Sequence, residues 1–344
     1  MLRRPAHGRD HRQAVSGGRP FAGLRPETIL AAAEKLGLRP SGELLALNSF
    51  ENRVFRVGLE TGDAVVLKFY RPKRWSDEAI LEEHAFLAEL AASDLPVVPA
   101  FRFAGNTLHR LRGFRYALFP ARGGRSFEGG AEALYRLGAL IARLHAVGVR
   151  GDFLARPRFD PIASIRRARE QALSSGLIPP VLAAAYAEAS RLLAEAAAKA
   201  IPRLPSQPML RLHGDLHRGN ILWDDREEAL LLLDFDDAVL GPPVQDLWML
   251  PAEDAAHPSP DRQALLEGYR LFGEIADAAF AWVPLLRAVR QAHWVGWIAE
   301  RWRDPAFPRA FPQLAEPIFW QEHVEDLREL AQALEDPQGP AARA

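Results

Sequence analysis

Short hydrophobic runs separated by polar turns fill the first third of the chain and predict β-strands. Strands are expected at Leu44–Leu47, Arg53–Leu59 and Ala64–Tyr70, and Thr61-Gly62-Asp63 is a favourable hairpin turn between the last two. Further strands are expected at 101–103, 107–111 and 114–119. The pattern predicts a twisted antiparallel sheet.

Hydrophobic residues at helical spacing dominate the rest of the chain. Ser76 is a suitable N-cap, and the apolar positions after it predict a helix that ends near Ala92. Helices are also expected at Glu27–Leu36, Glu132–His145, Pro180–Lys199, Asp261–Ile275, Pro284–Trp302 and Phe319–Leu334. The sequence therefore predicts an α+β fold with a small antiparallel β-rich N-lobe and a larger, mainly helical C-lobe.

A Gly-rich connector, Pro120-Ala121-Arg122-Gly123-Gly124-Arg125, separates the two patterns. Because hinges lie in connectors with few contacts, we expect the N-lobe to span residues 21–122 and the C-lobe residues 123–344. Residues 1–20 are rich in Arg, His and Gly and lack the apolar core of a secretory signal. They are expected to form a disordered basic extension.

The charge balance and the absence of cysteine narrow the class of protein. The chain has 43 Lys plus Arg and 44 Asp plus Glu, which gives a formal net charge of −1. Such a chain has no global attraction to nucleic acid or an anionic membrane, so neither is an expected partner. The lack of cysteine excludes disulfides and thiolate chemistry and fits a cytoplasmic protein.

The strongest chemical signal is the segment His213-Gly214-Asp215-Leu216-His217-Arg218-Gly219-Asn220. Two hydrophobic runs with a polar turn at residues 224–228 follow it, and the second run ends in Asp234-Phe235-Asp236. They predict a hairpin that brings Asn220 and Asp234 together at its open end. Kinases place a carboxylate where it accepts the proton of the attacking hydroxyl, and they hold magnesium with an asparagine five residues later and an aspartate after the next hairpin. Asp215 and Asp234 are therefore the predicted catalytic residues, and Asn220 and Asp234 the predicted magnesium ligands.

Two other interpretations of this segment remain open. Asp, Asn and Gly favour turns whatever the function, so an ordinary turn accounts for Asp215 and Asn220. His213 and His217 flank Asp215, and the three side chains are possible zinc ligands of a metal-dependent hydrolase. Magnesium keeps several waters when bound, so no third acid is required for the kinase interpretation.

A kinase also needs a cation on the nucleotide phosphates, normally a strand lysine held by a helix glutamate. Lys68 is the only charged residue in an apolar strand and shares a face with Val66 and Tyr70. Glu83 falls on the inward stripe of the helix after Ser76, so we predict that Glu83 holds Lys68. Glu82 is then expected to face solvent, although one residue of helix rotation would reverse the two.

The predicted phosphate-covering loop differs from the glycine-rich loop of most kinases. Its sequence is Leu47-Asn48-Ser49-Phe50-Glu51-Asn52-Arg53-Val54-Phe55, in which backbone N–H groups and the Ser49 hydroxyl can face phosphate oxygens. An ordinary Asn-Ser turn accounts for the same residues. Arg71, Lys73 and Arg74 lie farther along and are expected to form a solvated basic rim.

Several long motifs resemble the bacterial stress response kinase family. They are Asn48–Val54, Lys68–Trp75, Glu82-Glu83-His84, His213–Trp223, Gly241–Trp248 and Arg301–Pro308. This family belongs to the aminoglycoside phosphotransferase and choline kinase group, whose fold is protein-kinase-like. The similarity covers nearly everything after about Phe21.

The resemblance implies an ATP- and Mg²⁺-dependent serine/threonine protein kinase that also phosphorylates itself and acts in the cytoplasm under stress. Position by position, it implies Asp215 as catalytic base, Asn220 and Asp234 as magnesium ligands and Ser49 as an ATP-site residue. Asp236 is the alternative to Asp234, because the turn at residues 224–228 is longer here than is usual in the family. ATP and a protein with a Ser or Thr hydroxyl are the expected partners of a monomer.

Other interpretations of the function and of single residues stay open. A small-molecule kinase acting on an amino alcohol, sugar or aminoglycoside has the same catalytic residues, and an acidic C-lobe pocket would favour it. A non-catalytic nucleotide-binding scaffold is the third possibility. Asp246 is expected to hydrogen-bond the loop around Asp215, and Trp294, Trp297 and Trp302 are expected in the core, with an aromatic substrate groove as the alternative.

Overall fold

The computed structural model describes residues 20–225, 227–251 and 259–336. The predicted basic extension, apart from its last residue, lies outside these ranges, as does residue 226 of the predicted turn. No helix in the described residues combines the length and the hydropathy of a membrane-spanning segment.

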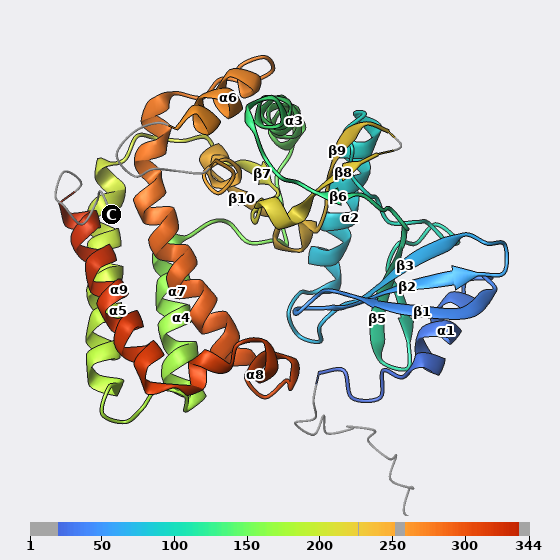
Figure 1. Ribbon diagram of the computed structural model, residues 1–344, viewed down its shortest axis with the longest axis horizontal. Coiled ribbons are helices and arrows are strands. Elements are labelled where there is room, and N and C mark those ends of the chain that lie inside the picture. The colour runs from blue at the N-terminus through green and yellow to red at the C-terminus, as the bar shows by residue number, and fades with distance from the viewer. Residues whose placement is uncertain (1–19, 226, 252–258, 337–344) are drawn as a thin grey trace, which may run out of the picture.

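An antiparallel sheet of five strands forms the smaller lobe, at the right of Figure 1. Its strands are β1 (Pro40–Leu47), β2 (Arg53–Leu59), β3 (Ala64–Phe69), β4 (His109–Leu111) and β5 (Phe114–Pro120). Their order is β1-β2-β3-β5-β4. The antiparallel sheet that the sequence predicts is therefore confirmed, but the strand expected at 101–103 is wrong, because Phe103 makes only an isolated bridge to Asn106.

Alternation along β3 separates two hydrophobic clusters. Val65, Leu67 and Phe69 are buried in a cluster with helix α1 (Pro26–Glu34), which covers one face of the sheet. Val66 and Tyr70 belong to the other large cluster, which continues into the second lobe. Because strand residues alternate between faces, Lys68 shares the face of Val66 and Tyr70 and is directed toward the second lobe.

Helix α2 (Asp77–Ala92) connects the two lobes. Ser76 caps it by accepting a hydrogen bond from the backbone N–H of Ala79, as the sequence predicts. Its apolar face, including Phe86, Leu87 and Leu90, is buried in the same large cluster. The inward face of α2 therefore also directs Glu83 toward the interior, where its exposed fraction is only 1%.

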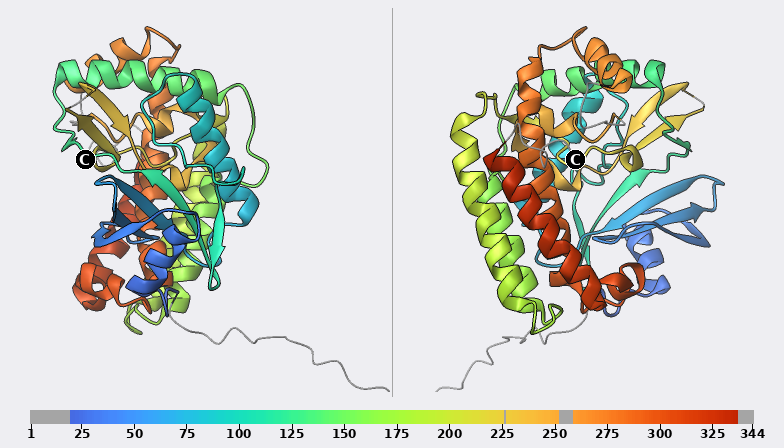
Figure 2. Two further views of the ribbon diagram at one scale, coloured as in Figure 1. Left: turned by 90° about the vertical axis from the view of Figure 1, so that its right-hand side faces the viewer. Right: turned by 60° about the vertical axis from the view of Figure 1, so that its left-hand side comes forward.

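The larger lobe is mainly helical, and in Figures 1 and 2 four of its long helices lie side by side. These four are α4 (Pro161–Ser175), α5 (Ala183–Ala200), α7 (Val283–Arg301) and α9 (Pro317–Glu335). The others are α3 (Ala131–Gly148), α6 (Pro260–Tyr269) and the short α8 (Ala306–Ala310). The α+β, two-lobed arrangement is confirmed, although the sequence pattern did not predict α4.

Short strands lie between the helices and the N-terminal sheet. β8 (Ile221–Asp224) and β9 (Ala229–Leu232) form the predicted antiparallel hairpin, and β6 (Arg125–Ser126) pairs with β8. β7 (Leu210–Leu212) pairs with β10 (Val239–Gly241). The segment His213–Asn220 thus leaves β7 and enters the hairpin, with both of its ends fixed by strands. A lobe boundary between residues 122 and 123 stays a prediction.

Candidate active site

The loop that contains Asp215 is held by a buried carboxylate. Asp246, which has no exposed surface, accepts hydrogen bonds from the backbone N–H groups of His213 at 2.9 Å and Gly214 at 2.8 Å. The Gln245 side chain donates to the Gly214 carbonyl at 2.9 Å. The predicted contact between Asp246 and this loop is present, and it fixes the backbone from which Asp215 projects.

Gly214 allows the loop to lie close to the Asp-Phe-Asp segment. Its φ of +87° lies in the left-handed region, and an added Cβ would collide with the Asp237 carbonyl oxygen. Only glycine combines this backbone angle with this close approach. Packing therefore requires glycine at position 214.

Asp215 is paired with an arginine that the sequence pattern did not identify. Arg290 of α7 donates to Asp215 Oδ1 at 2.6 Å, and His217 Nε2 lies 3.6 Å from Oδ2. Burial raises the pKa of the Asp215 carboxyl, but Arg290 lowers it further, so the pKa of Asp215 lies below its usual value. Asp215 is therefore ionised at neutral pH. A helical arginine 75 residues away gave no local signal in the sequence.

The histidines of the loop do not form a zinc site with Asp215. His213 Nε2 donates to the Leu233 carbonyl at 2.7 Å, and its Nδ1 accepts from the backbone N–H of Asp215 at 3.4 Å. Both ring nitrogens are thus used in holding the loop. Within the described residues there is no group of three or more His, Cys, Asp or Glu side chains that could hold a metal ion. The zinc interpretation therefore has no support in the described residues.

Lys68 is surrounded by three carboxylates. Its Nζ lies 3.2 Å from Glu83 Oε1, 3.5 Å from Asp234 Oδ1 and 3.0 Å from Asp236 Oδ1. Burial tends to lower the pKa of Lys68, but Asp236, Glu83 and Asp234 outweigh it and hold the pKa well above its usual value. The structure thus brings together Lys68 and Glu83, as the helical spacing predicts, and adds the segment after the hairpin.

The two aspartates of Asp-Phe-Asp differ in accessibility. The Asp234 side chain is 54% exposed, whereas that of Asp236 is 4% exposed and also pairs with Arg74. Burial opposes ionisation of Asp236, but Arg74 and Lys68 lower its pKa well below the usual value. Asp236 therefore has its charge neutralised inside the protein, and Asp234 has surface left for a ligand. Asn220 donates its amide nitrogen to the Asp215 carbonyl at 2.9 Å, which leaves the amide oxygen for a cation.

Arg156 is a further residue of the site that the sequence pattern did not identify. Its guanidinium has 0% exposed side-chain surface, lies 3.5 Å from Glu83 and donates to the Ala79 and Ala238 carbonyls. It thereby ties α2 to the segment that follows Asp234. Glu82, which was expected to face solvent, instead accepts from the backbone N–H groups of residues 154–156 at 2.7–3.1 Å. Glu82 and Glu83 therefore both hold α2 against the second lobe.

The expected solvated rim of Arg71, Lys73 and Arg74 is wrong for both arginines. Arg71 is 6% exposed and pairs with Glu51 at 2.9 Å and with Asp304 at 2.9 Å. Arg74 pairs with Asp236 and lies 2.5 Å from Asp237. Only Lys73 is exposed. The sequence shows the three charges but not the acids that other elements place beside them.

The loop that contains Ser49 is anchored to the C-lobe. Ser49 Oγ accepts from the backbone N–H of Asn52 at 3.3 Å. Glu51 accepts from Trp297 Nε1 at 2.6 Å and pairs with Arg301 at 2.8 Å. Phe50 packs against Phe307 and Phe311 of the α8 region. No contact of Ser49 with Lys68, Asp215, Asn220 or Asp234 is found among the described residues, so the structure leaves the role of Ser49 as a prediction.

Comparison with known proteins agrees with this geometry. The sequence profile of the phosphotransferase enzyme family matches residues 43–285. The chain belongs to this family. Stress response kinase A of Escherichia coli strain K12 is 38% identical over 318 residues, covering 92% of this chain and 95% of that protein. The serine/threonine protein kinase RdoA of Salmonella typhimurium is 37% identical with the same coverage.

Comparison with a solved structure shows the fold class of this chain. The amicoumacin kinase hAmiN, in complex with AMP-PNP, Ca²⁺ and Ami, matches with a TM-score of 0.70 at 18% identity, covering 92% of this chain and 96% of that one. The two-lobed fold is therefore protein-kinase-like. The resemblance to stress response kinases that the sequence motifs indicate is confirmed, and the chain is a kinase of this family.

Proposed function

We propose that this chain is an ATP- and Mg²⁺-dependent serine/threonine protein kinase that transfers the γ-phosphoryl group to a protein hydroxyl and also phosphorylates itself. The observation that carries the proposal is the contact of Lys68 in the N-lobe with Asp234 in the C-lobe, beside the loop that holds Asp215 and Asn220. Relatives at 37–38% identity are named stress response and serine/threonine kinases. The cytoplasm, where ATP is available, is the proposed location.

Each residue has a role that its environment supports. Lys68, kept charged by its carboxylate neighbours, binds nucleotide phosphates, and Glu83 positions it. Asn220 and Asp234 are the proposed Mg²⁺ ligands, because one has an amide oxygen to offer and the other an accessible carboxylate. Bound Mg²⁺ would neutralise charge on the phosphates.

Asp215 orients the acceptor hydroxyl and takes its proton late in the reaction. A hydroxyl is barely acidic, so an aspartate with a lowered pKa contributes mainly by aiming it. Catalysis then rests on positioning and charge neutralisation across the two lobes. The loop fixed by Asp246 supplies the rigidity that such positioning requires.

A small-molecule kinase is the second candidate, since the amicoumacin kinase shares the fold. Cationic amino alcohols and aminoglycosides would favour an acidic site around the catalytic aspartate. Here Arg290 lies directly on Asp215, and Arg287 is one helical turn away on α7. These positive charges favour an acceptor other than a cationic small molecule.

The test is transfer of labelled phosphate from ATP with Mg²⁺ to generic protein acceptors, to the chain itself and to a panel of small alcohols. Label on protein supports the proposal, and label on a small alcohol alone supports the second candidate. Asp215→Asn should lower turnover by roughly 10²–10⁴-fold while nucleotide binding persists. Undiminished transfer by this variant would remove Asp215 from its proposed role.

A further inference from the structure

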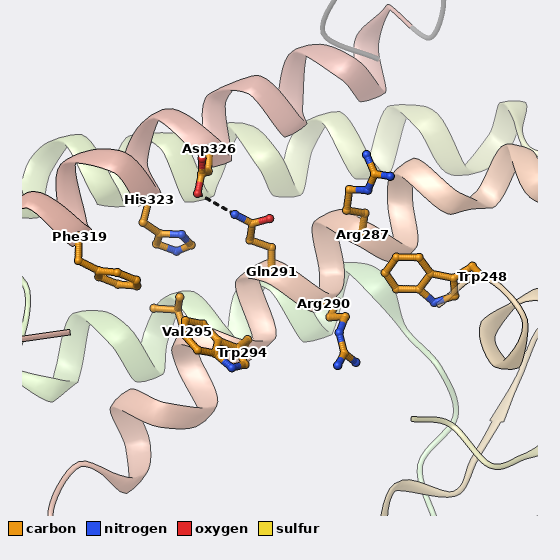
Figure 3. Close-up of a pocket in the computed structure, with 9 residues that line it drawn as sticks. All are labelled: Trp248, Arg287, Arg290, Gln291, Trp294, Val295, Phe319, His323 and Asp326. Carbon is orange, nitrogen blue, oxygen red and sulfur yellow. Dashed lines mark hydrogen bonds between the residues drawn. The ribbon is translucent and has the colours of Figure 1, made fainter. Parts of the chain in front are cut away.

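A pocket of about 280 Å³ lies beside the catalytic loop, between α7 and α9 (Figure 3). Small-molecule sites typically measure about 300–1,000 Å³. The pocket is therefore at the lower limit for a whole small molecule, but it has room for side chains of a larger acceptor. Arg290 lines the pocket and also donates to Asp215, so its guanidinium contacts both the pocket and the proposed catalytic carboxylate.

The two ends of the pocket differ in charge, because its arginines lie at one end. Figure 3 shows Arg287, Arg290 and Trp248 at one end and His323 and Phe319 of α9 at the other. Among the described residues, Arg287 has no acidic partner, whereas Arg290 is paired with Asp215. In the part of the chain that the structure describes, the end next to Asp215 therefore offers one arginine, Arg287, that no acid neutralises.

The acid in the lining is already hydrogen-bonded. Asp326 of α9 accepts from Gln291 at 2.7 Å, and burial together with Glu329 and Glu322 raises the pKa of its carboxyl. One carboxylate oxygen of Asp326 is thus already used by Gln291. In addition, the indole N–H of Trp248 has no hydrogen-bond acceptor among the described residues.

The wall away from the two arginines is apolar. Trp294 and Val295 of α7 face Phe319 of α9, and Trp294 packs edge-on against Phe311 and tilted against Phe319. The arrangement resembles an interface for a peptide, with an apolar wall and a charged end that fixes the orientation.

We propose that this pocket binds the protein acceptor next to the hydroxyl that is phosphorylated, and that Arg287 selects acceptors with an acidic side chain close to this hydroxyl. The inference rests on the proposed function and names the acceptor class of the same site. The position of the acid follows from geometry. Arg287 precedes Arg290 by three residues, about 4.5 Å along the helix, which is a step of roughly one to two residues in an extended segment at ~3.3 Å per residue.

The test uses the full chain and peptides that differ only in the residue flanking a single serine, which is Asp, Asn or Lys. The wild-type chain should show a kcat/KM roughly tenfold higher for the Asp peptide than for the Lys peptide, mostly through KM. Arg287→Gln should remove the preference, and Arg287→Glu should reverse it. Arg167→Glu, which changes an exposed arginine on α4 outside this pocket, is the matched control and should keep the wild-type order.

A gain of activity on the Lys peptide by Arg287→Glu cannot result from misfolding, so reversal separates selection from structural damage. Equal kcat/KM for the three peptides with the wild-type chain would overturn the inference while leaving the kinase proposal intact. Fluorescence anisotropy with labelled, serine-to-alanine peptides tests the pocket without transfer. Binding of the Asp peptide that depends on Arg287, in a chain that phosphorylates no protein or peptide, supports the pocket and contradicts the kinase proposal. Absence of binding overturns the inference in either case.

Discussion

Arg290 of α7 and Asp215 of the catalytic loop form an ion pair with a 2.6 Å contact between Nη1 and Oδ1. The carboxylate proposed to orient the acceptor hydroxyl is thus charged and held by a helix from the far part of the C-lobe. Because of this pair, the pKa of Asp215 depends on the packing of α7. Substitution of Arg290 tests this dependence.

Removal of Arg290 should raise the pKa of Asp215. Because Arg290 lowers that pKa in the folded protein, Arg290→Gln removes the lowering and leaves the opposing effect of burial. The acid limb of the kcat/KM profile should then move to higher pH. Arg290→Lys keeps the charge and should keep most of the shift. A uniform loss of rate with an unchanged acid limb in Arg290→Gln would show that the arginine acts only through structure.

Asp304 should be important for stability because it holds two arginines of the N-lobe. It lies 3.0 Å from Arg53 and 2.9 Å from Arg71, and both Asp304 and Arg71 are 6% exposed at their side chains. Asp304→Asn removes one of the two carboxylates that pair with the buried Arg71 guanidinium and leaves only Glu51, so it should lower the free energy of unfolding by about 3 kcal/mol. The KM for ATP should rise as well, because the same cluster anchors the loop of Ser49.

Glu60→Gln is the control for Asp304. Glu60 pairs with Arg39 at 3.5 Å, but both side chains are more than half exposed, at 57% and 80%. Its loss should change the free energy of unfolding by less than about 1 kcal/mol. Urea unfolding followed by tryptophan fluorescence measures both variants, and similar losses in the two would contradict the idea that burial makes the difference.

Gly214→Ala should abolish activity through a collision. The added methyl group would meet the Asp237 carbonyl and push the loop of Asp215 away from the Asp-Phe-Asp segment. Gly62→Ala is the matched variant, since Gly62 has a φ of +88° but no atom within 4 Å of the added Cβ. It should cost about 1 kcal/mol of stability and leave kcat unchanged. If Gly214→Ala retained wild-type kcat, close approach of the two segments would not be required.

Stability should fall as the pH drops below about 6.5, partly through His84. His84 is buried between the Tyr70 hydroxyl at 2.7 Å and the Thr107 hydroxyl at 2.8 Å, and burial lowers its pKa to about 3. In the unfolded chain the histidine has its usual pKa of about 6.5, so between pH 6.5 and 3 the unfolded chain binds a proton that the folded chain does not. Each pH unit in this range therefore lowers the free energy of unfolding by about 1.4 kcal/mol. His84→Gln should therefore unfold with a shallower pH dependence between pH 6.5 and 5. Parallel pH profiles for the two proteins would exclude this role.

The sequence by itself determined where the site residues lie on the predicted strands and helices, and which residue types the site contains. Strand alternation put Lys68 on the face of Val66 and Tyr70, helical spacing chose Glu83 over Glu82, and the hairpin brought Asn220 near Asp234. These inferences succeed because they depend on local periodicity, which a few neighbouring residues fix. The motifs around His213–Asn220 also indicate the family, because their residue types and spacing are visible in the amino-acid sequence.

Only the tertiary structure decided which charges meet. Arg290 reaches Asp215, Arg156 reaches Glu83, and Arg71 finds Asp304 from 233 residues away. An arginine in a sequence looks the same whether it is solvated or buried against an acid, because its partner is chosen by the packing of helices that are distant along the chain. The fold therefore decides which of these charges pair. It also forms the pocket that Arg290 lines beside Asp215.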